Sequence, residues 1–319
     1  MNHSDIHKPT VCVVGADLFL GLRICSYLLS LSHRPFEVVR AVVKDTNLNE
    51  KLEGFGCEVV KADFDDQEAL TSCFRNFDWV VILPYPHPER VRLALSCVEA
   101  SDKAHVENIL CCTFVGVDSQ LSSLREFKEL EDRVTQSPAQ TYILRLTFLL
   151  QTFLWWRKNF FEKNALSIPI GEGEFAPLDA SNVCQACAEI MEYCTMVNRH
   201  QSHTYILTGP KLLTGDEIAK VASDTLKVPI VFDPVTRDEC RQYLESVEDL
   251  DLFRTPENVP YRIETNLDLC ELVRRREMNF VTEDMMKLTG TRGKSVAKYF
   301  EENAESFHPP APAFESSRL

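Results

Sequence analysis

The chain has 319 residues, about twice the roughly 150 residues of a typical domain, so one large domain or two closely packed ones are both allowed. Its residues are 45% hydrophobic and 26% charged, ordinary globular proportions that exclude a disordered or collagen-like chain. The net charge of −14 disfavours binding to nucleic acid but is compatible with one small anionic cofactor in a local pocket.

The first ten residues are polar and lack the apolar stretch of a signal peptide. The longest apolar run, 144–156, is interrupted by polar side chains and is too short to cross a bilayer. We therefore expect a cytoplasmic protein, with the nucleus as a second location, that does not bind membranes. Most of the twelve cysteines lie in apolar runs, which favours buried thiols. Cys184 and Cys187 have the spacing of zinc ligands, but no second pair follows, so no metal site is predicted.

Short β-prone runs alternate with helical runs through the first half of the chain. The strands are continuous apolar runs, which is typical of a parallel sheet covered on both faces. The pattern therefore predicts a doubly wound, Rossmann-like α/β domain. Strands are expected at 11–14, 38–43, 58–60, 79–83, 109–117 and 141–146, and helices at 22–32, 67–76, 90–101 and 124–136.

The second half is mainly helical, with two short predicted strands. Thr282 is predicted to be the N-cap of the last of these helices. The final residues are rich in proline and serine and are predicted to be disordered. Helices are expected at 183–196, 214–226, 238–250, 267–277 and 282–288, and strands at 204–207 and 230–232.

The turn after the first predicted strand is a candidate phosphate-binding turn. In doubly wound sheets this turn usually holds the pyrophosphate of a dinucleotide, because glycines allow close backbone approach and the helix N-terminus supplies N–H donors. The turn reads Gly15-Ala-Asp-Leu-Phe-Leu-Gly21, which keeps two glycines of the motif and has Leu18 in place of the middle one. Alone, this motif fits a plain tight turn with a packing glycine equally well.

Lys44 directly follows the second predicted strand. The tip of this strand lies beside the adenosine ribose in the fold, where a cation pairs with a 2′-phosphate. Lys44 therefore favours NADP(H) over NAD(H), although a solvated loop lysine is an equal alternative.

Longer stretches resemble a known family, beginning with the strand, turn and helix at 11–29. The further pieces are VRAVVKD at 39–45, GCEVVKADFDDQEAL at 56–70, FDWVVILPYP at 77–86, FKELEDRVTQSPAQTYILRLTFLLQTF at 127–153, YILTGPKLLTGDEIAKVASDTL at 205–226 and VTEDMMKLTGTRGKSVAKYFEENAESF at 281–307. In this order they resemble the NmrA-like branch of the atypical short-chain dehydrogenase/reductase superfamily. The resemblance covers about residues 10–308.

The resemblance implies an NAD(P)-binding core over 10–155 and a smaller C-terminal α/β part over 156–308, interleaved with the core and closing a cleft. Residues 309–319 would form the disordered tail. Asp63 is expected to accept a hydrogen bond from the adenine amino group and Phe64 to border the ring, although a capping Asp and a core Phe are alternatives. The implied cofactor contacts are Gly15, Asp17, Leu18, Phe19, Gly21, Lys44, Asp63, Phe64, Leu83 and Pro84.

Two departures from the superfamily pattern bear on catalysis. Classical members use a Tyr-x-x-x-Lys pair; here Lys128 is present but Leu124 stands in the tyrosine position. Thr113 lies where a serine commonly orients the substrate, so Thr113 and Lys128 are the catalytic candidates. Lys128 is also expected to contact the nicotinamide ribose, with a solvated helix-face lysine as the alternative. Leu18 crowds the pyrophosphate path, and a positive φ there would cost about 1–2 kcal/mol.

Three function hypotheses follow. The first is an oxidoreductase that transfers a hydride from NAD(P)H to a small electrophile such as a quinone, which a cleft lined by Phe148, Phe153 and Trp155 would favour. The second is a redox sensor that follows the NADP(H) level and acts through a protein partner, which Leu18 and the missing tyrosine favour. The third is a degenerate Rossmann scaffold that binds no dinucleotide and acts through protein partners.

Overall fold

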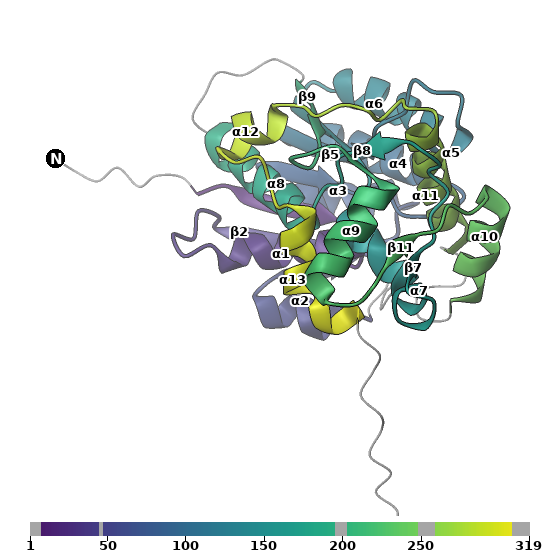
Figure 1. Cartoon of the computed structure of the whole chain (residues 1–319). Helices are drawn as coiled ribbons and strands as arrows, with labels where there is room; N and C mark the ends of the chain where they lie inside the picture. The colour runs from purple at the N-terminus through teal and green to yellow at the C-terminus, as the bar shows by residue number, and fades with distance from the viewer. Residues whose placement is uncertain (1–7, 45–46, 195–202, 248–258, 308–319) are drawn as a thin grey trace, which may run out of the picture.

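The computed structural model describes residues 8–44, 47–194, 203–247 and 259–307. Its centre is a seven-stranded sheet in the order β3-β2-β1-β4-β5-β6-β9, in which every neighbouring pair is parallel (Figure 1). This confirms the predicted doubly wound α/β fold. The strands are β1 (Thr10–Val14), β2 (Val38–Val43), β3 (Glu58–Lys61), β4 (Trp79–Ile82), β5 (Asn108–Phe114), β6 (Gln140–Leu146) and β9 (His203–Leu207).

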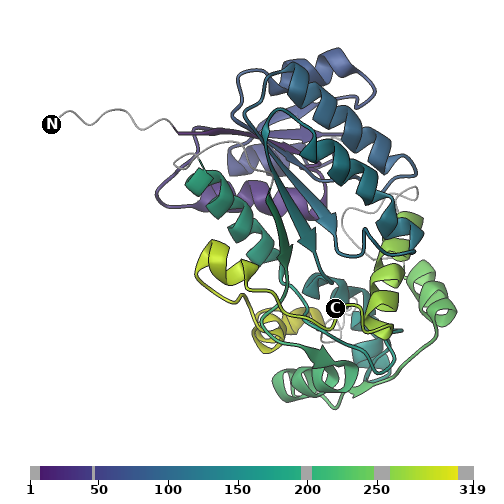
Figure 2. The same ribbon diagram turned by 90° about the horizontal axis from the view of Figure 1, so that it is seen from above.

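Both faces of the sheet are covered by helices, which explains why its strands are apolar throughout (Figure 2). Alternate residues of β1 point to opposite faces. Val11 and Val13 belong to the core beside α1 and α8, whereas Cys12 and Val14 belong to the core beside α3, α4 and α6. These flanking helices are α1 (Phe19–Ser30), α3 (Gln67–Phe74), α4 (Arg90–Lys103), α6 (Phe127–Thr135) and α8 (Ala180–Cys194).

The second half of the chain contributes to both parts of the molecule. Helix α8 and strand β9 pack on the central sheet, whereas most of the remaining segments form a smaller α/β part with its own hydrophobic core. Figure 2 shows this part, in green and yellow, beyond one edge of the sheet. Its elements include η1 (Leu150–Trp156), α7 (Arg157–Glu162), β7 (Ala165–Leu166), β8 (Glu174–Phe175), β10 (Leu213–Thr214), α9 (Gly215–Leu226), β11 (Val231–Phe232), α10 (Arg237–Ser246), α11 (Val259–Arg274) and α13 (Val296–Glu302).

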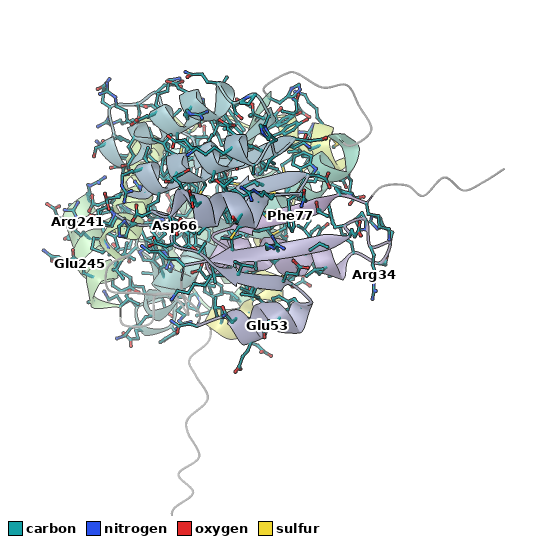
Figure 3. All side chains as sticks on the ribbon, turned by 180° about the vertical axis from the view of Figure 1, so that it is seen from behind. Arg34, Glu53, Asp66, Phe77, Arg241 and Glu245 are labelled. Carbon is teal, nitrogen blue, oxygen red and sulfur yellow. The ribbon has the colours of Figure 1, made fainter. Side chains whose placement is uncertain are left out.

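Three short helices complete the described chain: α2 (Asn49–Phe55), α5 (Ser122–Arg125) and α12 (Asp284–Thr289), followed by the one-turn η2 (Ala304–Phe307). Charged side chains such as Glu53 of α2 and Glu245 of α10 point into solvent (Figure 3). No helix in the described ranges combines the length and apolar character that a bilayer crossing requires. The predicted tail, 309–319, lies outside the described residues.

Two local predictions differ from the structure. Helix α12 begins at Asp284, so the prediction that Thr282 caps it is wrong. The Thr282 hydroxyl instead donates to the carbonyl oxygen of Ile206, and its amide donates to the hydroxyl of Thr208 at 3.2 Å, which fastens this segment to the end of β9.

The apolar run after β6 forms the 3₁₀ helix η1, which periodicity did not predict. Its buried residues, Leu150, Phe153 and Trp156, recur at every third position, the repeat of a 3₁₀ helix. Cys184 and Cys187 are buried in α8, and burial raises the pKa of the Cys184 thiol to about 12. The part of the chain that the structure describes contains no cluster of His, Cys, Asp and Glu able to hold a metal ion.

The β1–α1 turn is held by two close backbone contacts. Gly15 has a φ of +79°, and a Cβ there would lie 2.9 Å from the carbonyl oxygen of Leu83. A Cβ at Gly21 would lie 2.0 Å from the carbonyl oxygen of Gly15, so α1 packs directly on the turn. Leu18 has φ −85° and ψ 157°, an ordinary extended conformation. The backbone strain considered for Leu18 is therefore absent.

Replacing Gly21 by alanine should destabilise the protein by at least about 2 kcal/mol, because neither backbone segment can move without disturbing β1 or α1. Equilibrium urea unfolding measures this change. The matched control is Gly54→Ala, since an added Cβ at Gly54 in α2 has no neighbour within 4 Å. That variant should gain roughly 0.5–1 kcal/mol from helix propensity. Equal stability of the two variants would contradict the packing described here.

Candidate functional site

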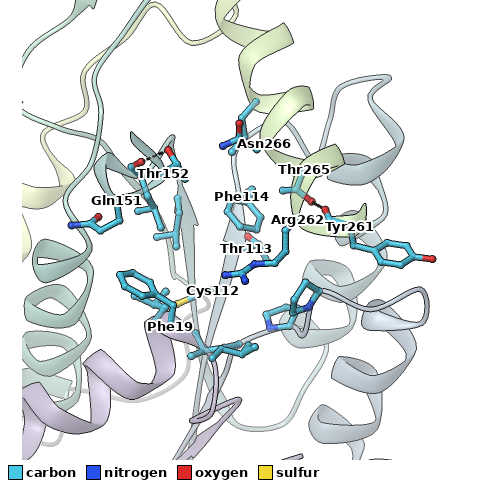
Figure 4. Close-up of a pocket in the computed structure, with 18 of the residues that line it drawn as sticks. Phe19, Cys112, Thr113, Phe114, Gln151, Thr152, Tyr261, Arg262, Thr265 and Asn266 are labelled. Atoms are coloured by element: carbon cyan, nitrogen blue, oxygen red, sulfur yellow. Dashed lines mark hydrogen bonds between the residues drawn. The ribbon is translucent and has the colours of Figure 1, made fainter. Parts of the chain in front are cut away.

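A cavity of about 240 Å³ lies at the carboxyl edge of the central sheet, between the strand ends and α11 (Figure 4). Most of the side chains around it are apolar or aromatic. They come from the β1–α1 turn, the loop after β4, the ends of β5 and β6, η1, α6 and α11. The lining residues are Leu18, Phe19, Leu20, Leu83, Pro84, Pro86, Arg90, Cys112, Thr113, Phe114, Phe127, Leu146, Leu149, Gln151, Thr152, Leu154, Trp155, Tyr261, Arg262, Thr265, Asn266 and Leu269.

The cavity floor brings together several of the predicted cofactor residues. Leu18 and Phe19 reach it from the start of α1, and Leu83 and Pro84 reach it from the loop after β4. In the described structure no side chain caps α1 and its first turn carries no acidic residue. The backbone N–H groups at this helix end therefore point to a place where an anion would be stabilised. Gly15 and Gly21 allow the close backbone packing that forms this turn.

Thr113 lines the cavity from the end of β5, but its hydroxyl already has a partner. Thr113 Oγ1 donates to Oε1 of Glu131 at 2.6 Å, and Glu131 is buried. Glu131 also pairs with Arg145, whose Nη2 lies 2.6 Å from Oε2. Leu124 is completely buried. The structure therefore places Thr113 where the sequence predicted it, with its proton held by a buried carboxylate.

Lys128 is not brought to the cleft. Helix α6 buries Phe127, Leu130 and Glu131 against the sheet, so Lys128 lies on its outer face. Its Nζ pairs with Asp132 at 2.9 Å, and this hydrogen bond raises the pKa of Lys128. Lys128 borders a separate open hollow on the surface of α4 and α6. The geometry thus matches the solvated helix-face alternative rather than contact with a nicotinamide ribose or with Thr113.

The predicted adenosine-binding residues lie together at the ends of β1, β2 and β3, outside the cavity lining. Lys44 and Asp63 are exposed, and Asp63 Oδ1 accepts the N–H of Asp65 at 3.0 Å. Phe64 is buried. Asp17 Oδ2 accepts the backbone N–H of Lys44 at 3.1 Å.

Sequence reasoning missed Tyr85, which occupies the middle of this group. Its hydroxyl donates to Asp17 and accepts the N–H of Lys44 at 3.1 Å. Its ring meets the ring of Phe64 edge-on, with centroids 5.2 Å apart. Burial and then the charge of Asp17 raise the pKa of Tyr85 well above its usual value, so the hydroxyl keeps its proton. In the sequence, only its position between Pro84 and Pro86 could have drawn attention to Tyr85.

Helix α11 closes the cavity from the smaller part of the molecule. Arg262 points toward the cavity in Figure 4, with its guanidinium 6.0 Å from the ring centroid of Trp155. Asn266 and Thr265 line the same side. Of the three aromatic residues whose presence in a cleft would favour an oxidoreductase, Trp155 lines the cavity, whereas Phe148 and Phe153 are fully buried in the core. These α11 residues follow the first turn by more than 200 positions, and no motif linked them to it.

Arg90, at the start of α4, ties α11 to the sheet domain. It is buried, and its guanidinium lies 4.7 Å from the ring centroid of Phe127. It pairs with Glu126 and donates to the hydroxyl of Thr265 at 2.8 Å and to the carbonyl oxygen of Ser123 at 2.6 Å. Arg90 therefore positions α11 over the cavity.

Comparison with known proteins agrees with this geometry. Residues 15–152 match a family model described as NAD(P)H-binding. The chain is also 22% identical over 299 residues to the NAD(P)H azoreductase of Xenophilus azovorans, a match that covers 93% of this chain and 99% of the azoreductase.

Solved structures share their fold with most of the chain. The NADPH-dependent quinone oxidoreductase of Escherichia coli, complexed with NADPH, is similar with a TM-score of 0.76 at 18% identity, covering 92% of this chain and 99% of that one. NmrA, a negative transcriptional regulator in complex with NAD, is similar with a TM-score of 0.68 at 14% identity, covering 93% and 95%. These similarities show the fold and are consistent with the resemblance to the NmrA-like, atypical short-chain dehydrogenase/reductases.

Replacing Arg90 by leucine should lower the free energy of unfolding by about 3 kcal/mol. The substitution removes a buried guanidinium and leaves the groups that it bonds without their hydrogen-bond donor. Backbone amide exchange should rise in α11. Arg92→Leu is the matched control, because Arg92 lies on the same helix and pairs with Asp65 and Glu89 in solvent. That variant should change little. Unchanged exchange of α11 in Arg90→Leu would refute the role given to Arg90.

Proposed function

We propose that the chain binds NAD(P)H along the carboxyl edge of the sheet, with the nicotinamide end in the cavity, and reduces a small, flat, apolar electrophile such as a quinone. The observation that carries this proposal is the position of the cavity. It lies where the uncapped start of α1, the Leu83–Pro84 segment and Thr113 meet, beneath a helix from the other part of the molecule.

The residues present fit a dinucleotide at this edge. Gly15 is in the left-handed region, so the turn follows the path that brings the backbone of α1 toward a phosphate. Leu18 has relaxed backbone angles, so its side chain lines the cavity at no backbone cost. When bound, the cofactor supplies a hydride, and the side chains around the cavity orient the acceptor and exclude water.

The lining favours a planar conjugated acceptor. Phe114, Phe127 and Trp155 supply flat aromatic surface, and Gln151 and Asn266 supply polar groups at the edge. The similarity to an NAD(P)H azoreductase and an NADPH-dependent quinone oxidoreductase supports this substrate class.

The source of the proton that the substrate needs after hydride transfer narrows the substrate class further. Among the described lining residues, Thr113 is bonded to Glu131, and the hydroxyl of Tyr261 points away from the cavity in Figure 4. Leu124 replaces the usual tyrosine acid. Hydride addition to a quinone gives a weakly basic hydroquinone anion that takes its proton from water, whereas an aldehyde gives a strongly basic alkoxide that needs an acid. We therefore propose quinones rather than aldehydes.

The choice of cofactor depends on the tip of β2. Lys44 is exposed there and supports a preference for NADP(H) through its charge. The carboxylate of Asp17, bound to the Lys44 amide, lies at the same tip and disfavours a 2′-phosphate. We propose that NADP(H) is preferred through Lys44, and we expect the preference to be small because Asp17 opposes it.

A sensor that binds NADP(H) and acts through a protein partner is the second candidate. The feature that favours it is the lack of a tyrosine acid beside Thr113. The similarity to NmrA, a negative transcriptional regulator, points the same way.

Calorimetric titration tests cofactor binding and the role of Lys44. Lys44→Ala should weaken NADPH binding about five- to tenfold and leave NADH binding nearly unchanged, because only NADPH carries the 2′-phosphate. Lys51→Ala, which removes another exposed lysine in α2, is the control and should bind both as the wild type does. A Lys44→Ala variant that keeps the wild-type preference contradicts the assignment. Absence of binding at millimolar cofactor refutes the proposed function.

Steady-state oxidation of NADPH tests the reaction. We expect the absorbance at the reduced-nicotinamide band to fall with quinone acceptors and to stay constant with aldehydes of similar size. Tight NADPH binding without oxidation by any quinone would instead favour the sensor. Efficient aldehyde reduction would show that an acid exists and would contradict the account of the proton supply.

A further inference from the structure

A buried tyrosine, Tyr85, lies among Asp17, Lys44 and Phe64, the residues assigned to the adenosine end of the dinucleotide site. We propose that Tyr85 is a latch that occupies the adenosine position and must swing out before the cofactor binds along its full length. This inference rests on the proposed function, because it concerns how the same site admits NAD(P)H. It adds a residue that controls cofactor affinity without contacting the reacting atoms.

The extent of the cavity is the first observation. Its volume of about 240 Å³ is below the roughly 300–1,000 Å³ of pockets that enclose drug-sized ligands, and a dinucleotide is larger than most of these. The lining ends at Leu18 on the β1–α1 turn and at Pro84 and Pro86 on the loop after β4. The open space therefore suits the nicotinamide half of the cofactor, and its lining includes none of Lys44, Asp63 and Phe64 at the adenosine end.

The position of Tyr85 is the second observation. Tyr85 has 5% of its surface exposed, and its neighbours lie at three strand ends: Asp17 after β1, Lys44 after β2 and Phe64 after β3. The adenosine of a dinucleotide binds across these strand ends in doubly wound folds. The phenol ring takes the place beside Phe64 that an adenine would take, and its hydroxyl uses the Asp17 carboxylate that a ribose hydroxyl would use.

The chemistry of the contacts makes an exchange feasible. When Tyr85 leaves, Asp17 loses one hydroxyl donor, and the ribose of the incoming cofactor offers hydroxyl donors of the same kind. The carboxylate keeps the Lys44 amide as a donor and regains a hydroxyl donor, so the exchange costs it no net hydrogen bond. Tyr85 lies in the irregular segment between β4 and α4, so side-chain rotation breaks no helix or sheet hydrogen bond. The flanking prolines, Pro84 and Pro86, restrict the backbone and confine the motion mainly to the side chain.

Half-cofactor titrations test the latch directly. AMP probes the adenosine end and nicotinamide mononucleotide probes the other end, each titrated by calorimetry into wild type, Tyr85→Phe and Tyr85→Ala. We expect Tyr85→Ala to bind AMP at least about tenfold more tightly, equivalent to about 1.4 kcal/mol, because no side chain must be displaced. Tyr85→Phe loses the bond to Asp17 but keeps the ring, so its gain should be smaller. Binding of nicotinamide mononucleotide should not change.

The control is Tyr27→Phe, which removes a tyrosine hydroxyl on α1 and should leave both titrations unchanged. Melting temperatures and circular dichroism verify folding, and Tyr85→Phe, which preserves the packed ring, remains decisive if Tyr85→Ala is unstable. Unchanged or weaker AMP binding in both Tyr85 variants would overturn the latch, and weaker binding would make Tyr85 a stacking surface for adenine. If neither the wild type nor any variant binds either half or the whole cofactor, the proposed function is refuted as well. If NAD(P)H binds but AMP affinity is unchanged in the Tyr85 variants, only the latch is refuted.

Discussion

The close packing of Gly21 on the carbonyl oxygen of Gly15 determines where α1 begins, and with it the position of the cavity. With no side chain at position 21, α1 begins directly on the turn after β1, at the carboxyl edge of the sheet. Gly15 in turn lies against the Leu83 carbonyl, which fixes the loop after β4 beside the helix start. The anion-stabilising end of α1 and the apolar loop thus share one edge of a cavity, and Leu18 fits between them with unstrained backbone angles.

The second half of the site depends on long-range polar contacts rather than on the sheet. Arg90 spans from the start of α4 to Thr265, and Asp268 accepts hydrogen bonds from the amide and the hydroxyl of Ser123 at 3.2 and 2.6 Å. These bonds hold α11 above the strand ends, where it supplies Arg262 and Asn266. The sheet domain and the smaller part therefore line one cavity together, a common location for substrate binding.

The strand and helix pattern was predictable because a parallel sheet buried on both faces demands continuous apolar strands, and β2 was predicted with its observed bounds, Val38–Val43. The turn at 15–21 was predictable from glycine spacing. The surroundings of single side chains were not: the outward direction of Lys128 follows from which face of α6 packs on the sheet, and Tyr85 closes on Asp17 across 68 positions of chain. Neither fact can be read from the spacing of apolar residues along a short stretch of sequence.

A dinucleotide bound along the strand ends, with its pyrophosphate at the start of α1, would shield the backbone there from solvent. Hydrogen–deuterium exchange by mass spectrometry, with and without saturating NADPH, measures this protection. We expect slower exchange at residues 15–21 and 83–86, with no change at 128–133, the part of α6 that carries Lys128. Protection confined to the outer face of α6, where Lys128 lies, or no protection at 15–21 under saturating cofactor, would contradict the account.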